Sequence, residues 1–294
     1  MLYPSIAVPG LEIDAQSVHE TLIEFVKTQM LKAGRNKAVF GLSGGLDSVV
    51  LAFLLTEALG SDNVLAAVLP YHTTCSKSLQ DAKNVRDILG LQCVTMDITP
   101  MVNECQRTLL AATGKEPDNV RLGNIMARQR MILLYDLSAA IGGLVIGTSN
   151  KTELLLGYGT LHGDLAFAFD PLGDLYKTQV RSYARYLGVP ENIVVKPPSA
   201  DFWVGQTDEA DLGFTYDDLD KLLYLMVDGR RSKQELLKIG FDRGFIDAVK
   251  ARVRRNKFKA KMPVIAGLQK RGIGGDYRYW RSTTSQKSRV QSGL

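Results

Sequence analysis

Cysteine and histidine are both scarce in this sequence. The cysteines are Cys75, Cys93 and Cys105, and the histidines are His19, His72 and His162. Neither set contains a C-x-x-C pair or another spacing that ligates a metal, so the sequence predicts no zinc site and no disulfide framework. An odd, unpatterned set of cysteines is typical of a reducing compartment, and we therefore expect a cytoplasmic protein.

Long apolar runs are absent as well. No charge-free apolar stretch is long enough to span a bilayer, so we expect no membrane-spanning helix. The N-terminal residues Met1-Leu2-Tyr3-Pro4 lack the basic segment and apolar core of a secretory signal, and none is expected. The 294 residues, 45% hydrophobic and 23% charged, suit one large globular domain or one domain with appendages.

Acidic residues are nearly missing from the last part of the chain. Residues 250–294 contain thirteen Lys or Arg and one acid, which gives +12; the whole chain carries +5, so the remainder carries −7. A basic segment of this kind can meet a nucleic acid or another anion, but a solvated helix face and tail explain it equally well. We expect no nucleic acid partner, and a nucleic-acid-binding protein without enzymatic activity is kept as an alternative.

Strand-like and helical patterns alternate along the chain. Continuous apolar runs predict buried strands at residues 37–42, 64–69, 93–96 and 144–146. Helical spacing of apolar residues predicts helices at residues 18–33, 48–59, 76–89, 98–112, 120–141 and 178–187, and three more at 216–226, 232–239 and 245–258. The alternation predicts an α/β fold with a doubly wound parallel sheet, helices on both faces and additional C-terminal helices. Ligands of such sheets bind at the carboxyl ends of the strands.

The segment that follows the first expected strand is rich in glycine and serine. It reads Gly41-Leu42-Ser43-Gly44-Gly45-Leu46-Asp47-Ser48. A strand that turns into a helix presents unpaired N–H groups and the positive end of the helix dipole, which together bind phosphate. Gly44 and Gly45 lack the Cβ atoms that would hold an anion away, and they permit positive φ. Ser43 and Ser48 add hydroxyl donors, so the sequence predicts a phosphate site here.

Asp47 places a carboxylate beside this phosphate site. Two negative groups repel each other unless a cation lies between them, so Asp47 indicates Mg²⁺. The segment is not a Walker A loop, because the G-x-x-x-x-G-K-[ST] order is absent and no lysine lies in the turn. The alternative is an ordinary glycine-rich turn in which Asp47 is the helix N-cap.

The segment resembles the Ser-Gly-Gly-x-Asp-Ser loop of the ATP pyrophosphatases, which split ATP into AMP and pyrophosphate. Five later stretches narrow this resemblance. They are GNIMARQR at residues 123–130, GTSNKTE at 147–153, GDLYKTQV at 173–180, KPPSAD at 196–201 and GQTDE at 205–209. Together and in this order they resemble the ammonia-dependent NAD synthetase family, over roughly residues 18–266.

This resemblance implies an adenine nucleotide alpha hydrolase-like fold and a particular reaction. ATP adenylates the nicotinate carboxylate of deamido-NAD, pyrophosphate leaves, and ammonia attacks the acyl-adenylate to give NAD and AMP. Such a reaction needs positioning and charge neutralisation rather than a nucleophilic side chain. The family further implies Mg²⁺ and a homodimer. Whether ammonia arrives free or from a separate glutaminase stays open.

The resemblance also assigns residues to ligands. The ATP-binding residues it implies are Gly41, Leu42, Ser43, Gly44, Gly45, Leu46, Asp47, Ser48, Arg130, Thr148, Lys177 and Ser199. The residues implied for deamido-NAD are Arg128, Asp164 and Lys259. Asp47 and Glu153 would hold Mg²⁺, and Asp47 and Lys177 would be catalytic. The alternatives are a surface ion pair for either arginine and a first-turn helix acid for Glu153. Because the two arginines are two positions apart on a helix, they cannot face the same way.

The sequence departs from the family pattern at two places. Leu161 stands where many relatives have the lysine of a Lys-Tyr-Gly-Asp-Gly stretch, and Phe258 stands where many have the histidine of a His-Lys pair. The acceptor is therefore less well defined than the adenylation. The alternatives are another ATP pyrophosphatase that amidates or thiolates a different acceptor, and a relative that binds nucleotide without turnover.

Two segments lack apolar periodicity and are expected to be loops that carry function. Residues 154–174 would form a long active-site loop, and residues 200–214 a mobile lid. We expect residues 1–266 to form the catalytic domain. The basic, polar residues 267–294 would form a tail that is partly disordered.

Overall fold

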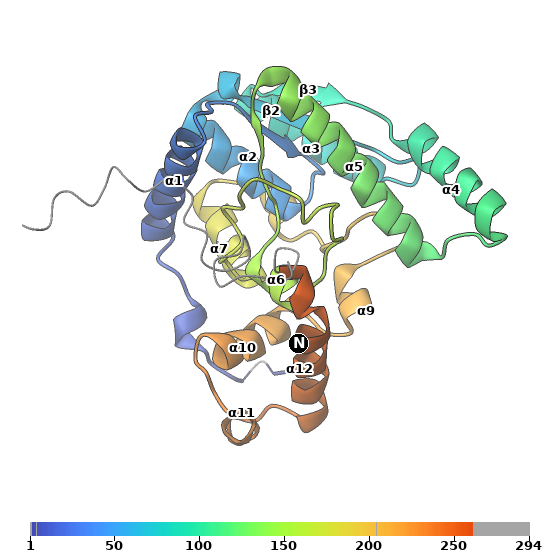
Figure 1. The fold of residues 1–294 in the computed structure, drawn as a ribbon. Helices are drawn as coiled ribbons and strands as arrows, with labels where there is room; N and C mark the ends of the chain where they lie inside the picture. The colour runs from blue at the N-terminus through green and yellow to red at the C-terminus, as the bar shows by residue number, and fades with distance from the viewer. Residues whose placement is uncertain (1, 4, 204, 261–294) are drawn as a thin grey trace, which may run out of the picture.

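The structure is a computed structural model that describes residues 2–3, 5–203 and 205–260 (Figure 1). Its centre is a parallel sheet in the strand order β3-β2-β1-β4. The strands are β1 (Ala38–Gly41), β2 (Val64–Val68), β3 (Gln92–Thr95) and β4 (Leu144–Val145). The doubly wound parallel sheet predicted from the alternating pattern is therefore confirmed.

Helices cover both faces of this sheet (Figure 1). One face packs against α1 (Ala15–Lys32), α2 (Leu46–Leu59), α3 (Ser76–Leu89) and α7 (Lys177–Tyr186). The other face packs against α4 (Thr99–Thr113) and α5 (Asn119–Ile141). Successive residues of a strand point to opposite faces, and accordingly the neighbours Ala66 and Ala67 of β2 belong to two different apolar cores.

A second helical unit lies beyond the sheet, at the lower end of Figure 1. It consists of α10 (Tyr216–Val227), α11 (Lys233–Ile239), α12 (Arg243–Asn256) and the short 3₁₀ helix η3 (Lys257–Ala260). The N-terminal segment packs into the same core, which the sequence did not predict. There the ring of Tyr3 lies 5.0 Å from that of Phe241 and 5.2 Å from that of Phe245, and a short 3₁₀ helix, η1 (Pro9–Leu11), leads on to α1.

The sequence missed several short helices. They are η2 (Ser61–Asn63), α6 (Lys151–Leu156), α8 (Glu191–Val194) and α9 (Asp208–Leu212). The loop expected at 154–174 is thus wrong at its first three residues, and the expected lid at 200–214 contains α9. Helices of three to six residues are too short to show apolar periodicity, so tertiary contacts decide them. The predicted tail lies outside the described residues. Within the described part of the chain, no helix is long and apolar enough to cross a membrane.

Tyr3→Ala is expected to lower the free energy of unfolding by about 2–3 kcal/mol, because it removes a half-buried ring packed between two phenylalanines. Urea denaturation measures this loss. Tyr3→Phe is the matched control, since it keeps the ring and removes only the hydroxyl that accepts from the Asp242 amide at 3.3 Å. Equal stability of wild type and Tyr3→Ala would show that the N-terminal segment adds nothing to this core.

Candidate active site

A cavity of about 300 Å³ opens where β1, β2 and β4 end. Its wall contains the strand-end residues Gly41, Val68 and Val145, as expected for a ligand site of a doubly wound sheet. Every residue that the sequence assigned to ATP lines this cavity except Gly44, and both residues assigned to Mg²⁺ line it as well. The structure thus brings together residues from five separate stretches of the chain.

The phosphate loop joins β1 to α2. Gly45 is the N-cap of α2, and it has no side-chain cap. Asp47 lies inside the first turn of the helix, so the alternative that Asp47 is an N-cap is wrong. The loop is held by its own hydroxyls, because the Ser43 amide donates to the Ser48 Oγ at 3.2 Å and the Gly45 amide donates to the Ser43 Oγ at 3.2 Å.

Gly44 is excluded from the cavity by close packing against α3. Its φ is +75°, and a Cβ built at this position would lie 2.1 Å from the Ser78 carbonyl oxygen. Neither the backbone conformation nor the space admits another residue. Gly44 therefore shapes the loop from behind, while Gly45 faces the cavity.

The ammonium of Lys177 is the centre of charge in the cavity. It forms a short ion pair with Asp47 and a second ion pair with Glu153 at 3.2 Å. The side chain of Lys177 is 3% exposed, and those of Asp47 and Glu153 are each 15% exposed. Burial acts to lower the pKa of Lys177, but the two carboxylates outweigh it and hold the pKa above its usual value. Lys177 therefore carries a positive charge at neutral pH.

Glu153 is held by several groups from different elements. Its amide donates to the Asn150 Oδ1 at 3.0 Å, which caps α6, and its Oε1 accepts from the Tyr216 hydroxyl at 3.3 Å. Burial raises the pKa of the Glu153 carboxyl to about 7, against the opposing effect of Lys177. The carboxyl thus sits in an environment that disfavours its charge unless a cation is close.

Asp47 and Glu153 fit a hard divalent cation. Both carboxylates reach the same ammonium, so they lie close to one another, and both line the cavity beside the phosphate loop. Mg²⁺ is commonly bound by one or two carboxylates together with phosphate oxygens and water. The described residues contain no cluster of three His, Cys, Asp or Glu that would form an all-protein metal cage. Two carboxylates beside a phosphate loop therefore fit a metal that is also bound by phosphate oxygens.

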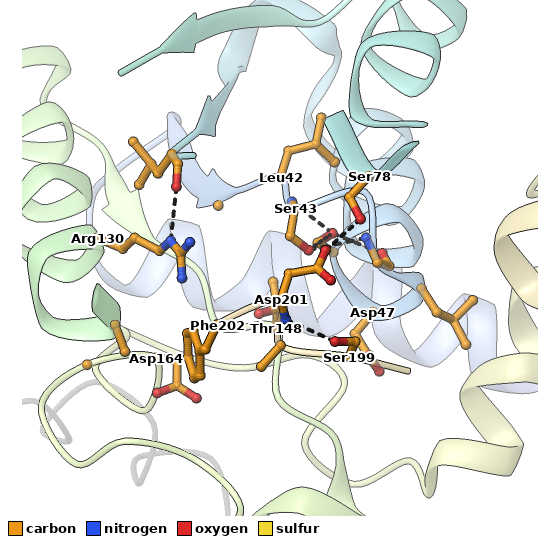
Figure 2. A pocket seen from close by; sticks show the side chains of 18 of the residues that line it. Leu42, Ser43, Asp47, Ser78, Arg130, Thr148, Asp164, Ser199, Asp201 and Phe202 are labelled. Atoms are coloured by element: carbon orange, nitrogen blue, oxygen red, sulfur yellow. Dashed lines mark hydrogen bonds between the residues drawn. The ribbon is translucent and has the colours of Figure 1, made fainter. Parts of the chain in front are cut away.

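The opposite side of the cavity carries Arg130 and Asp164 (Figure 2). The Arg130 Nε donates to the Leu69 carbonyl at 3.0 Å, and its guanidinium lies 5.7 Å from the centre of the Phe202 ring. Burial lowers the pKa of Arg130 to about 10, while Asp164 and Asp201 act in the opposite direction. Arg130 thus stays positive at neutral pH, and its contacts hold the guanidinium at the wall of the cavity.

Two residues assigned to deamido-NAD do not line the cavity. Arg128 is exposed and donates to the Leu161 carbonyl at 3.3 Å, so the two arginines do face different ways, as expected. Lys259 donates to the carbonyls of Gly157 and Gly159 at 2.9 and 2.8 Å. In this structure both residues support the loop that carries Asp164, and their contact with a dinucleotide stays a prediction.

Several lining residues were missed by the sequence analysis. They are Ser78, Tyr158, Lys196, Asp201, Phe202 and Asp208. Asp208 is the clearest case, because it is buried and accepts from the hydroxyls of Tyr158 at 3.0 Å and Tyr216 at 3.2 Å. Burial raises the pKa of the Asp208 carboxyl. The stretch at 205–209 signalled the family, but no spacing in it indicates that Asp208 turns toward Glu153.

Comparisons with known proteins agree with this set of cavity residues. The sequence profile of the NAD synthase family matches residues 18–263. The chain belongs to the NAD synthase family. A relative from Chlorobaculum parvum, named NH(3)-dependent NAD(+) synthetase, is 47% identical over 94% of this chain and 98% of its own length.

Solved structures of NAD synthase relatives have the same fold. An NH3-dependent NAD synthetase from Campylobacter jejuni is similar with a TM-score of 0.73 and 35% identity, over 87% of this chain and 100% of that one. A structure of NMN synthetase from Francisella tularensis is similar with a TM-score of 0.75 and 30% identity, over 87% of this chain and 99% of that one. The adenine nucleotide alpha hydrolase-like fold expected from the resemblance is confirmed.

Gly44→Ala is expected to distort the phosphate loop, because its Cβ would clash with the Ser78 carbonyl. Gly34→Ala is the matched control, since Gly34 has φ +64° with no heavy atom within 4 Å of an added Cβ. The control should lose only the ~1 kcal/mol that positive φ costs a residue other than glycine. Gly44→Ala should lose about 1–3 kcal/mol more in urea denaturation and bind ATP more weakly. Equal losses for the two variants would contradict the close approach.

Proposed function

We propose that this chain catalyses the ATP-dependent amidation of deamido-NAD by ammonia, with NAD, AMP and pyrophosphate as products. The observation that carries this proposal is the phosphate loop at the end of β1, facing Asp47, Glu153 and Lys177 in one cavity. Membership of the NAD synthase family and the names of the similar relatives support the same acceptor and the same nitrogen donor.

The first step would form the acyl-adenylate. A carboxylate oxygen of the acceptor attacks the α-phosphorus of ATP, and the bond to the bridging oxygen breaks as pyrophosphate leaves. Ser43, Gly45 and Ser48 would hold the departing phosphates by their N–H and hydroxyl groups. Lys177 would supply positive charge to them, since its ammonium is buried beside the loop. Thr148 and Ser199 would contact ATP from the other strand end and from the segment before the lid.

Asp47 and Glu153 would hold Mg²⁺, which when bound supplies charge neutralisation for the triphosphate. Both carboxylates also pair with Lys177, whose ammonium reduces the repulsion between them. In the second step, ammonia attacks the acyl carbon, the bond to the adenylate oxygen breaks, AMP leaves, and the nitrogen releases one proton to solvent. The protein would act by positioning and by excluding water from the mixed anhydride.

The identity of the substrate that is amidated has a second candidate. Asp164 lines the cavity, while Arg128 and Lys259 do not, and Leu161 replaces a basic residue common in relatives. One structural neighbour is an NMN synthetase, so a nicotinate mononucleotide is the alternative acceptor. Competition between deamido-NAD and nicotinate mononucleotide in one reaction, with both amides quantified, decides between them by the ratio of kcat/KM.

A homodimer and a cytoplasmic location are further proposals. The exposed side chains of Ile132 and Tyr135 on α5 support the dimer, because large apolar groups on one helix face favour association. Light scattering on the purified chain measures its mass. The cytoplasmic location rests only on the cysteine pattern, in which all three cysteines are free. A separate glutaminase as the ammonia source stays a prediction.

Incubation with ATP, Mg²⁺, ammonium and deamido-NAD is expected to yield NAD, AMP and pyrophosphate in equal amounts. The reason is the loop type, since a pyrophosphatase loop faces the cavity and a Walker A loop is absent from the sequence. Chromatography of the nucleotides measures all three products. ADP and orthophosphate as the only products would contradict the proposal, and AMP without NAD would indicate a different acceptor.

Asp47→Asn is expected to slow AMP formation by about 100-fold or more, because the triphosphate loses one carboxylate ligand of its metal. The matched control is Glu57→Gln, which removes a carboxylate from the far end of the same helix, where Glu57 pairs with His19 at 2.9 Å. The control should retain normal turnover. Near-normal turnover of Asp47→Asn at saturating Mg²⁺ would exclude Asp47 as a metal ligand and leave its ion pair with Lys177 as its role.

A further inference from the structure

Lys196 is a lining residue to which the proposed reaction gives no role. Its ammonium donates to the Ser78 Oγ at 2.9 Å, to the Asp81 Oδ2 at 3.0 Å and to the Gly44 carbonyl at 3.4 Å. An ammonium has three N–H donors, so three acceptors within the protein engage all of them. Lys196 is therefore held against the phosphate loop and α3 by three acceptors of the protein.

The contact with Gly44 has a consequence for the next amide. A trans peptide unit is planar, and its C=O and N–H point in opposite directions. When the Gly44 carbonyl points to Lys196, the Gly45 N–H must point away from it, and there it meets the Ser43 Oγ at 3.2 Å. Gly45 and Lys196 both line the cavity. The orientation of one peptide plane thus decides whether a donor or an acceptor faces an anion.

This peptide plane needs an external restraint. It lies between two glycines, and glycine populates positive and negative φ about equally, so the plane can rotate at little cost. A rotated plane would turn the Gly44 carbonyl toward the phosphates and lose a donor. The restraint is rigid, because Asp81 is 5% exposed, is fixed on α3, and also accepts from the Asn192 Nδ2 at 3.2 Å.

Ser78, which accepts from Lys196, also contacts the beginning of the expected lid. The Ser78 hydroxyl donates to the Asp201 Oδ2 at 2.6 Å, an interaction drawn in Figure 2. Asp201 has φ +52°, and the neighbouring Phe202 carbonyl accepts from the Thr73 hydroxyl at 3.3 Å. Lys196, α3 and the segment leading to the lid therefore form one connected support behind the phosphate loop.

We propose that Lys196 is a positioning residue that fixes the Gly44–Gly45 peptide so that the Gly44 carbonyl stays turned away from the β- and γ-phosphates of ATP. This inference rests on the proposed function, in which the loop binds a triphosphate that leaves as pyrophosphate. It predicts a selective defect. Ligands that place a phosphate on this loop should lose affinity, and a ligand without those phosphates should not.

The test compares three ligands on the full chain by isothermal titration calorimetry. Lys196→Met keeps the length and apolar character of the side chain and removes its donors. It is expected to raise the Kd of Mg-ATP and of Mg-pyrophosphate about tenfold, the range of one or two lost charge-assisted hydrogen bonds. The Kd of AMP should stay within about twofold. Lys77→Met is the matched control, because Lys77 is an exposed lysine one position before Ser78 and its loss removes the same charge.

Asp81→Asn separates positioning from direct contact with phosphate. Positioning predicts weaker Mg-ATP binding, since the tether of Lys196 is loosened. Direct contact predicts tighter binding, because a negative charge near the phosphates has gone, and that result would overturn the inference. Two results with Lys196→Met would overturn it too: unchanged Kd values for all three ligands, or a rise in the Kd of AMP as large as the rise in the Kd of Mg-ATP. If Lys196→Met fails to melt cooperatively, the Asp81→Asn result decides.

The wild-type chain separates this inference from the proposed function. A wild-type chain that binds no Mg-ATP would refute the proposed function itself, whereas normal wild-type binding with unchanged variants refutes only the role of Lys196.

Discussion

The ion pairs of Lys177 with Asp47 and Glu153 are the interaction on which the rest of the site depends. The three side chains come from the starts of α7, α2 and α6, which are more than 20 residues apart in the sequence. Charges this well buried are costly unless they are paired and hydrogen-bonded. Removing Lys177 would leave two buried carboxylates without their ammonium, so the starts of three helices are constrained to meet at one point beside the phosphate loop.

The C-terminal helices are part of this constraint rather than an appendage. The hydroxyl of Tyr216, at the start of α10, lies 3.3 Å from the Glu153 Oε1 and 3.2 Å from the Asp208 Oδ2, so its single proton is shared between the two carboxylates. Asp220 on the same helix accepts from the Thr152 hydroxyl and from the Thr178 amide, and so ties α10 to the starts of α6 and α7. Burial raises the pKa of Asp220 to about 6. The core formed by the C-terminal helices thus helps to position the charged side chains at the starts of α6 and α7, beside the cavity.

The phosphate loop is governed by its backbone more than by its side chains. Gly44 fits against α3 only because it has no Cβ, and Gly45 begins α2 with its amide turned to the Ser43 hydroxyl. A loop of this kind binds anions through the directions of its N–H groups. Those directions are set by neighbours that carry no phosphate-binding pattern of their own, among them Ser78, Asp81 and Lys196.

The sequence by itself determined the parallel sheet, the long helices and the residues of the phosphate loop. Strands and long helices repeat an apolar pattern over many residues, and the loop is contiguous, so both can be found in one dimension. The tertiary structure alone decided which distant side chains meet. It put Asp208 and Tyr216 beside Glu153, and it turned Arg128 and Lys259 to the loop carbonyls of Leu161 and of Gly157 and Gly159 instead of the cavity. These placements depend on the packing of short helices and on backbone hydrogen bonds, which leave no periodic trace in a sequence.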